Sequence, residues 1–272
     1  MTATAITPPR AERPHRSPLA WAVSDSTTIA WRNLITLKRL PQLLIFATVQ
    51  PVIFVLMFRY VFGGAISVPG FPYVDYLMPG VFAQTVAFGA IQTGVGLAED
   101  LHKGLIERFR SLPMARSAVL AGRTVADLVR NVFVVGLMLV VGFLVGFRVH
   151  TDALGLIAGM AVMLLFGFSL TWIFAIIGLS TSNAETAQAA SFPILAPLVF
   201  ASSAFVPVNS MPGWLQAFAK NQPVSVAIDA VRSLVLGGQF SNTGKVVASI
   251  AWSVGIIAIF APLAIRRYRR AA

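Results

Sequence analysis

The chain has 272 residues, of which 57% are hydrophobic, only 11% are charged and none is cysteine. Because an ordinary soluble domain is about 25% charged, this composition excludes a soluble globular protein and indicates an integral membrane protein, and it also excludes disulfides and thiolate metal sites. The net charge of +11 would suggest nucleic-acid binding in a soluble protein, but here it is attributed to Lys and Arg held on the cytoplasmic side, so no nucleic acid is expected as a partner.

The N-terminal region divides into a tail and a helix. Residues 1–23 are mainly Pro- and Arg-rich and contain no apolar core, so they predict a disordered cytoplasmic tail and no cleavable signal peptide. Residues 24–40 predict an amphipathic helix in the membrane interface, because its polar residues form one narrow stripe at helical spacing (Asp25, Thr28, Arg32, Thr36 and Arg39). A short lead-in to the first span is the alternative.

Two predicted spans follow. The first covers residues 41–62, and the second covers 76–98, where 23 residues carry no charge. The second span nevertheless contains several glycines and two glutamines. Its polar residues are interpreted either as contacts for close helix packing or as the lining of a substrate path. The candidate path residues are Gln84, Phe88 and Gln92, which recur at i, i+4 and i+8, together with Ser202 and Ser203 near a later span.

Residues 99–123 form a charged stretch between two apolar ones. Within it, Leu101, Leu105, Phe109 and Leu112 recur at i, i+4, i+8 and i+11, which is one face of a helix that Pro113 would end. Such a helix is too polar for lipid and too apolar on one face for water, so the segment 100–113 predicts a docking helix. A helix that lies only on lipid headgroups is the alternative.

The next two predicted spans cover residues 124–147 and 153–180. In the first of them Asp127 and Arg130 are three residues apart and can pair; a proton relay is the less favoured interpretation. The second falls within 31 uncharged residues, which is enough for one tilted helix and too short for two.

The fifth predicted span, 186–206, contains two prolines and should be kinked. Residues 207–241 then include two short segments that each start at a proline, which predicts a helical hairpin dipping into the membrane from the outside. Asp229 and Arg232 in this hairpin are expected to form a structural pair rather than a site.

The last predicted span, 246–265, is uncharged and is followed by the basic tail 266–272. Six spans place both termini on one side, which then carries 15 of the 21 Lys and Arg residues, against four on the opposite side. By the positive-inside rule both termini and the charged stretch are cytoplasmic. The sequence therefore predicts an all-α integral membrane fold with six transmembrane helices, an interfacial helix, a cytoplasmic coupling helix and an extracellular re-entrant hairpin.

The sequence shows no cluster that fits catalysis or metal binding. The three histidines are scattered, and neither HExxH nor GxSxG occurs. Residues 238–246, GQFSNTGKV, are similar to a phosphate-binding loop, but five residues separate the glycines and Val stands where that loop needs Ser or Thr. The chain is therefore expected to be no enzyme, to carry no cofactor and not to hydrolyse ATP itself.

The order of these features resembles the permease subunit of type-2 ABC exporters. Residues 103–108, KGLIER, followed by Leu112 and Pro113, are similar to the coupling segment G-x-x-E-R…P of that family. Further similar segments precede the last span, at residues 205–207, 211–215, 221–223 and 230–232. The resemblance is strongest to the daunorubicin/doxorubicin-resistance permeases of actinobacteria, which include lipid exporters.

This resemblance implies a permease in the bacterial plasma membrane that moves an amphipathic drug-like or lipid substrate out of the cytoplasm or the inner leaflet. It implies two copies of a separate ATPase subunit, which bind ATP and Mg²⁺. It also implies a second permease that is identical or closely related, and membrane lipid around the assembly. The residues implied to couple to the ATPase are Leu101, Lys103, Gly104, Leu105, Glu107, Arg108, Phe109, Leu112 and Pro113.

Two other functions compete with an ABC permease. An ion-coupled secondary transporter would need ionisable residues near the membrane centre and usually two related halves, and the sequence shows neither. An integral membrane enzyme that modifies lipid would need paired carboxylates or a His/Asp cluster at an interface, which the sequence also lacks.

Overall fold

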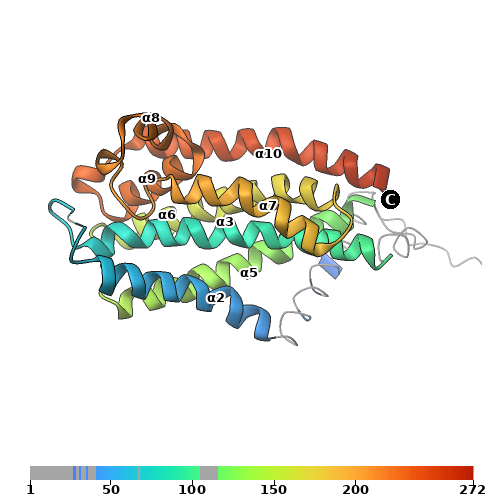
Figure 1. The fold of residues 1–272 in the computed structure, drawn as a ribbon, viewed down its shortest axis with the longest axis horizontal. Coiled ribbons are helices and arrows are strands. Elements are labelled where there is room, and N and C mark those ends of the chain that lie inside the picture. The colour runs from blue at the N-terminus through green and yellow to red at the C-terminus, as the bar shows by residue number, and fades with distance from the viewer. Residues whose placement is uncertain are drawn as a thin grey trace, which may run out of the picture.

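The computed structural model describes residues 27, 28, 31, 35, 41–66, 68–104 and 116–271. Within this part of the chain all regular elements are helical and there is no β-strand, so the all-α prediction is confirmed there. The long helices run along a common direction. The short helices α8 (Gly213–Asn221) and α9 (Pro223–Val235) lie at the end of the bundle opposite to the C-terminus (Figure 1).

Helix α3 (Tyr73–His102) is the centre of the bundle. It packs against α5 (Arg116–Leu144), α6 (Ala153–Gly178) and α7 (Ala184–Phe200), and most of its side chains are buried. The main hydrophobic core includes Leu77, Phe82 and other residues of α3 with residues of its neighbours. A helix that packs against neighbours over most of its surface cannot hold unpaired charges there, and the predicted span 76–98 carries no charged residue.

Glycines allow α3 and α6 to approach closely. A Cβ atom added to Gly94 would collide with the carbonyl oxygen of Phe174, and one added to Gly178 would collide with the backbone of Gly94. Small residues at such a crossing permit backbone contact between membrane helices. At these positions the packing interpretation of the glycines in the second predicted span is confirmed.

Four of the described helical stretches are long and apolar enough to cross a membrane: Tyr73–His102, Gly122–Leu144, Ala153–Gly178 and Thr243–Arg270. They correspond to the predicted spans 76–98, 124–147, 153–180 and 246–265. The chain is thus a multi-pass membrane protein. The predicted span 41–62 coincides with α2 (Pro41–Leu56) and the π-helix η1 (Met57–Phe62) that continues it, of which Thr48–Phe62 is a short apolar helix. In place of the predicted span 186–206 there is α7 with 17 residues. Six membrane crossings therefore stay a prediction.

The fifth predicted span ends too late, because α7 ends at Phe200 and not at residue 206. Residues 201–206 form a turn instead. The Ser202 hydroxyl donates to the carbonyl oxygen of Val199 at 2.5 Å and accepts from the backbone N–H of Ala204 at 3.1 Å. Serine side chains that bond to nearby backbone in this way favour turns over helix.

Two other helix ends also differ from the prediction. Helix α5 ends at Leu144, three residues before the predicted end, and the following turn contains Gly146 with a φ of 100°. Helix α10 (Thr243–Ala271) continues through the arginines, so the predicted basic tail 266–272 is helical up to Ala271. Arginine is a good helix former and its charge is favourable near a helix C-terminus, which explains the extension.

The predicted coupling helix 100–113 is interrupted at its start. Helix α3 ends at His102, the N–H of Lys103 bonds back to the carbonyl of Glu99, and Gly104 has a φ of 65° with its N–H bonded to the carbonyl of Leu101. A glycine with positive φ is a common helix terminator. Leu101 therefore belongs to α3, where it packs against a cluster that includes Leu97, Leu120 and Tyr268, and the predicted uninterrupted helix from residue 100 is broken at Lys103 and Gly104.

Several predicted regions lie outside the described residues. They are the tail 1–23, residues 105–113 of the coupling segment with Leu105, Glu107, Arg108, Phe109, Leu112 and Pro113, and most of the interfacial helix 24–40. The four described residues of that last region are helical (Thr27, Thr28, Trp31 and Ile35).

Candidate functional site

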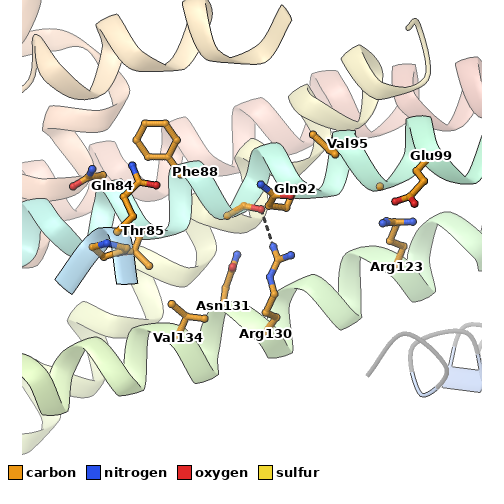
Figure 2. A pocket seen from close by; sticks show the side chains of 14 residues that line it. Gln84, Thr85, Phe88, Gln92, Val95, Glu99, Arg123, Arg130, Asn131 and Val134 are labelled. Atoms are coloured by element: carbon orange, nitrogen blue, oxygen red, sulfur yellow. Dashed lines mark hydrogen bonds between the residues drawn. The ribbon is translucent and has the colours of Figure 1, made fainter. Parts of the chain in front are cut away.

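A cavity of about 370 Å³ with a mixed polar and apolar wall lies between α2, α3 and α5, and we call it the α3–α5 cavity (Figure 2). Its wall combines uncharged polar groups, apolar groups and three charged side chains. The lining residues are Gln50, Pro51, Gln84, Thr85, Phe88, Gly89, Gln92, Val95, Gly96, Glu99, Arg123, Arg130, Asn131 and Val134.

One stripe of α3 forms the long wall of the cavity. The positions from Gln84 to Glu99 recur at intervals of three and four residues, so they lie on one face of the helix. Gln84, Phe88 and Gln92 line the cavity from successive turns, and the ring of Phe88 also lies against Phe192 of α7. The structure thus brings together the three candidate path residues of the second predicted span.

A stripe of α5 forms the opposite wall, with Arg123, Arg130, Asn131 and Val134 at i, i+7, i+8 and i+11. Helix α2 closes the cavity only at one end, where Gln50 and Pro51 line it. These residues were not predicted as a site. The periodicity of polar residues on α5 could have indicated a shared face, but their position opposite α3 depends on how the two helices pack.

Arg130 and Asp127 tie α5 to α3 beside the cavity. Their side chains are 3.3 Å apart, as the i, i+3 spacing predicted. Arg130 also donates to the carbonyl oxygen of Gly89 at 2.7 Å, and the Thr93 hydroxyl donates to Asp127 at 2.6 Å (Figure 2 shows the bond of Arg130). Because its carboxylate is partnered by a cation and a hydroxyl, Asp127 has the environment of a structural ion pair.

Arg123 and Asp100 form a second connection between the same two helices. Both side chains are mostly buried, and the guanidinium lies against α3 where a Cβ on Gly96 would collide with it. Arg123 lies next to Glu99, which is half exposed at the cavity end nearest the end of α3. This end therefore offers charged groups of both signs.

Gln84 lies at the other end of the cavity and is the most deeply buried of its amides, with 1% of its surface exposed. Its side-chain oxygen is buried and has no hydrogen-bond partner. A buried acceptor without a partner is unfavourable by about 1–3 kcal/mol. Gln92, by contrast, is exposed in the middle of an apolar helix.

The other two candidate path residues, Ser202 and Ser203, do not line this cavity. Both are buried in the turn after α7. The Ser203 hydroxyl donates to Asp229 at 3.0 Å and its N–H donates to the Ser225 hydroxyl at 3.1 Å, so the contacts of this serine hold the turn against α9.

The predicted pair of Asp229 and Arg232 is present, at 3.3 Å. Arg232 is almost fully buried and also donates to the backbone carbonyl oxygens of Tyr76, at 2.9 Å, and Ser203, at 2.7 Å. The guanidinium therefore connects α9 to α3 and to the turn after α7. This network holds α9, α3 and the turn after α7 together, and we call it the Arg232 clamp.

Of the implied coupling residues, Leu101, Lys103 and Gly104 are described. Lys103 is exposed at the end of α3, and its ammonium group donates to Glu99 at 2.6 Å. This hydrogen bond and the charge of Glu99 raise the pKa of Lys103 above its ordinary value, so the lysine stays protonated. Gly104 ends α3, as described above.

Comparison with known proteins identifies the family. Residues 26–236 match the family described as ABC-2 type transporter. The chain is 40% identical over 259 residues to the daunorubicin resistance ABC transporter permease protein DrrB1 of Streptomyces coeruleorubidus, covering 95% of this chain and 89% of that one. It is 30% identical over 233 residues to the probable doxorubicin resistance ABC transporter permease protein DrrC of Mycobacterium tuberculosis, covering 83% and 81%.

A more distant relative is the putative transport permease ycf38 of Cyanophora paradoxa, which is 26% identical over 216 residues. That match covers 78% of this chain and 74% of the relative. The family match spans the helices that form the α3–α5 cavity and the clamp around Arg232. The chain belongs to the ABC-2 type transporter family and is related to the permeases of drug-resistance exporters.

Proposed function

We propose that this chain is the membrane-spanning permease subunit of an ATP-driven exporter in the bacterial plasma membrane, with both termini in the cytoplasm. It moves an amphipathic drug-like or lipid substrate out of the cytoplasm or the inner leaflet. Two copies of a separate ATPase subunit bind ATP and Mg²⁺, and a second permease, identical or closely related, completes the membrane part. The chain itself has no catalytic role.

The observation that carries this proposal is the connection between the cavity and the predicted coupling segment. Helix α3 ends at His102, three residues after Glu99, and helix α5 begins at Arg116, seven residues before Arg123. Glu99 and Arg123 both line the α3–α5 cavity. A push on the segment between α3 and α5 would therefore act directly on the two helices that form the cavity walls.

The chemistry of the predicted coupling segment supports docking to a protein. Leu105, Phe109 and Leu112 offer apolar side chains, and Glu107 and Arg108 offer charges that can set register and orientation against a partner. The family match supports the same function, because relatives with the printed names of ABC transporter permeases align over most of the chain.

Recruitment of the ATPase is the direct test. The permease is co-expressed with a candidate partner ABC ATPase, and the membrane-bound fraction of the ATPase is measured. Glu107→Arg combined with Phe109→Asp should abolish recruitment and ATP-driven transport. The matched control is a charge reversal combined with a Phe-to-Asp change at exposed positions of α8, Lys220→Glu with Phe218→Asp, which should leave recruitment unchanged.

Normal recruitment by the Glu107/Phe109 variant would contradict the coupling role. Transport that persists without ATP but collapses with the proton gradient would instead support an ion-coupled transporter.

A further inference from the structure

We infer that the α3–α5 cavity is the binding site for an elongated amphiphile that carries a hydroxyl or N–H group near its inner end, and that Gln84 recognises this group. The inference rests on the proposed function in one respect, namely that the bound molecule is the transported substrate. The shape, the charge distribution and the hydrogen-bonding groups of the cavity each support it.

The cavity is long and narrow. Its lining runs along α3 from Gln84 to Glu99, which corresponds to about 22 Å at the rise of an α-helix. A volume of about 370 Å³ spread over that length favours an extended molecule over a compact one of the same size. The ligand is therefore elongated.

The two ends of the cavity differ in polarity. Glu99 and Arg123 line the end nearest the start of the predicted coupling segment, and either can receive a charged or polar headgroup. The opposite end has no charged lining residue and combines the apolar Pro51 and Val134 with the uncharged polar Gln50, Gln84 and Thr85. A ligand that matches both ends is an amphiphile with its head at Arg123 and Glu99.

A plain hydrocarbon chain does not match the inner end, because the side-chain oxygen of Gln84 is buried there without a hydrogen-bond partner. An alkyl chain would leave that acceptor unsatisfied, whereas a hydroxyl or N–H group on the ligand would donate to it. A site built to bond a ligand donor discriminates against the analogue that lacks the donor.

The side of the cavity is open in the described chain. Gln92 and Gln50 line the cavity and are exposed, although both lie within apolar helices. An amide facing hydrocarbon is unfavourable, so this side requires a polar ligand, water or a polar partner surface. A ligand with hydrogen-bonding groups along its body satisfies these amides as it enters.

The test compares two probes that differ by a single hydroxyl, palmitate and ω-hydroxypalmitate. Both place a carboxylate at Arg123, and their extended chains are about as long as the cavity. Because the natural chain contains no cysteine, Val95→Cys introduces a single thiol in the cavity wall. The full-length permease is reconstituted in nanodiscs, and the rate of thiol modification by N-ethylmaleimide is measured as each probe is added.

The expected result is that ω-hydroxypalmitate slows modification of V95C at about tenfold lower concentration than palmitate does. Adding Gln84→Met should remove this preference by weakening protection by ω-hydroxypalmitate, whereas palmitate should protect at least as well as before, which also shows that the variant is folded. Ile259→Cys on α10, which is 60% exposed and does not line the cavity, reports any general effect of the fatty acids on the bilayer and should show no protection.

Absence of protection at V95C, equal protection by both probes, or a preference that survives Gln84→Met would each overturn the inference. The assay uses the permease without its ATPase, so its outcome is independent of the recruitment test. Failed recruitment with intact protection would overturn the proposed function alone, and normal recruitment without protection would overturn the cavity assignment alone.

Discussion

The guanidinium of Arg232 lies 3.5 Å from the centre of the Tyr76 ring, and it also donates to the backbone carbonyl of the same tyrosine at 2.9 Å. The Tyr76 hydroxyl in turn donates to the carbonyl of Ser203 at 3.0 Å. Arg232 and Tyr76 are 156 residues apart in sequence. Their contact joins the short helix α9, at one end of the bundle, to the central helix α3.

Replacing Arg232 should therefore destabilise the protein strongly. Arg232→Met retains much of the side-chain volume but leaves the carbonyls of Tyr76 and Ser203 and the carboxylate of Asp229 without this donor, at a cost of about 3–5 kcal/mol. The measurement is the apparent melting temperature of the purified permease. Arg267→Met, at an exposed position of α10, is the matched control and should have little effect; similar melting temperatures for the two variants would contradict the clamp.

The crossing of α3 and α6 should tolerate no side chain at Gly94. Gly94→Ala places a Cβ against the backbone of Phe174, and relieving that overlap should cost about 1–3 kcal/mol. Gly136→Ala is the control, since a Cβ at Gly136 meets nothing within 4 Å and alanine favours helix, so stability should be unchanged or slightly higher. Thermal unfolding of both variants checks the prediction, and equal responses would refute close packing at this crossing.

Asp100 and Arg123 should behave as a coupled pair. Asp100→Arg alone brings two cations together, and Arg123→Asp alone brings two carboxylates together, so each should lower stability and ATP-driven transport. The double exchange should recover part of both losses, with an interaction free energy of about 1–3 kcal/mol in a double-mutant cycle. If the effects of the two single substitutions on stability simply add in the double variant, Asp100 and Arg123 do not interact in the membrane-embedded protein.

The exposed pair of Lys103 and Glu99 provides the comparison for that cycle. Both side chains are at least half exposed, so solvent screens their interaction. Lys103→Ala should leave the apparent melting temperature unchanged while the Asp100 and Arg123 single variants lower it. A larger effect at Lys103 than at Arg123 would reverse our assignment of which pair holds α3 to α5.

Asp127 should be required for stability and not for proton coupling. Asp127→Asn leaves Arg130 without its anion beside the cavity, which should cost on the order of 3 kcal/mol, whereas Glu185→Gln at an exposed position should have little effect. In vesicles, transport by the surviving D127N protein should still follow ATP and ignore the proton gradient. Loss of a proton dependence that the unmodified protein shows would assign Asp127 a relay role.

Features that depend on neighbouring residues could be predicted from the sequence. Uncharged stretches located the four candidate membrane-crossing helices to within a few residues at most ends, because helix formation and burial in lipid follow from local composition. Proline marked the starts of α8 and α9 for the same reason. The pairs Asp127–Arg130 and Asp229–Arg232 followed from the i, i+3 spacing alone.

Helix ends were less predictable where distant residues decide them. Helix α7 stops at Phe200 because the turn after it is held by Tyr73, Tyr76 and Arg232, which lie far away in sequence. The break at Gly104 was hidden by an apolar periodicity that continues across it. A periodic pattern indicates a face, but it does not show whether one helix carries the whole face.

The sequence by itself determined that this protein is an all-helical membrane permease with a charged segment between two apolar helices. Only the tertiary structure decided which polar residues share a cavity. Gln84, Phe88 and Gln92 could be grouped because they lie on one helix, whereas Arg123, Arg130 and Asn131 reach them through the packing of α5 on α3, and Ser202 and Ser203 lie elsewhere. Spacing along a helix sets which side chains share a face, but the neighbour of that face is chosen by contacts between segments remote in sequence.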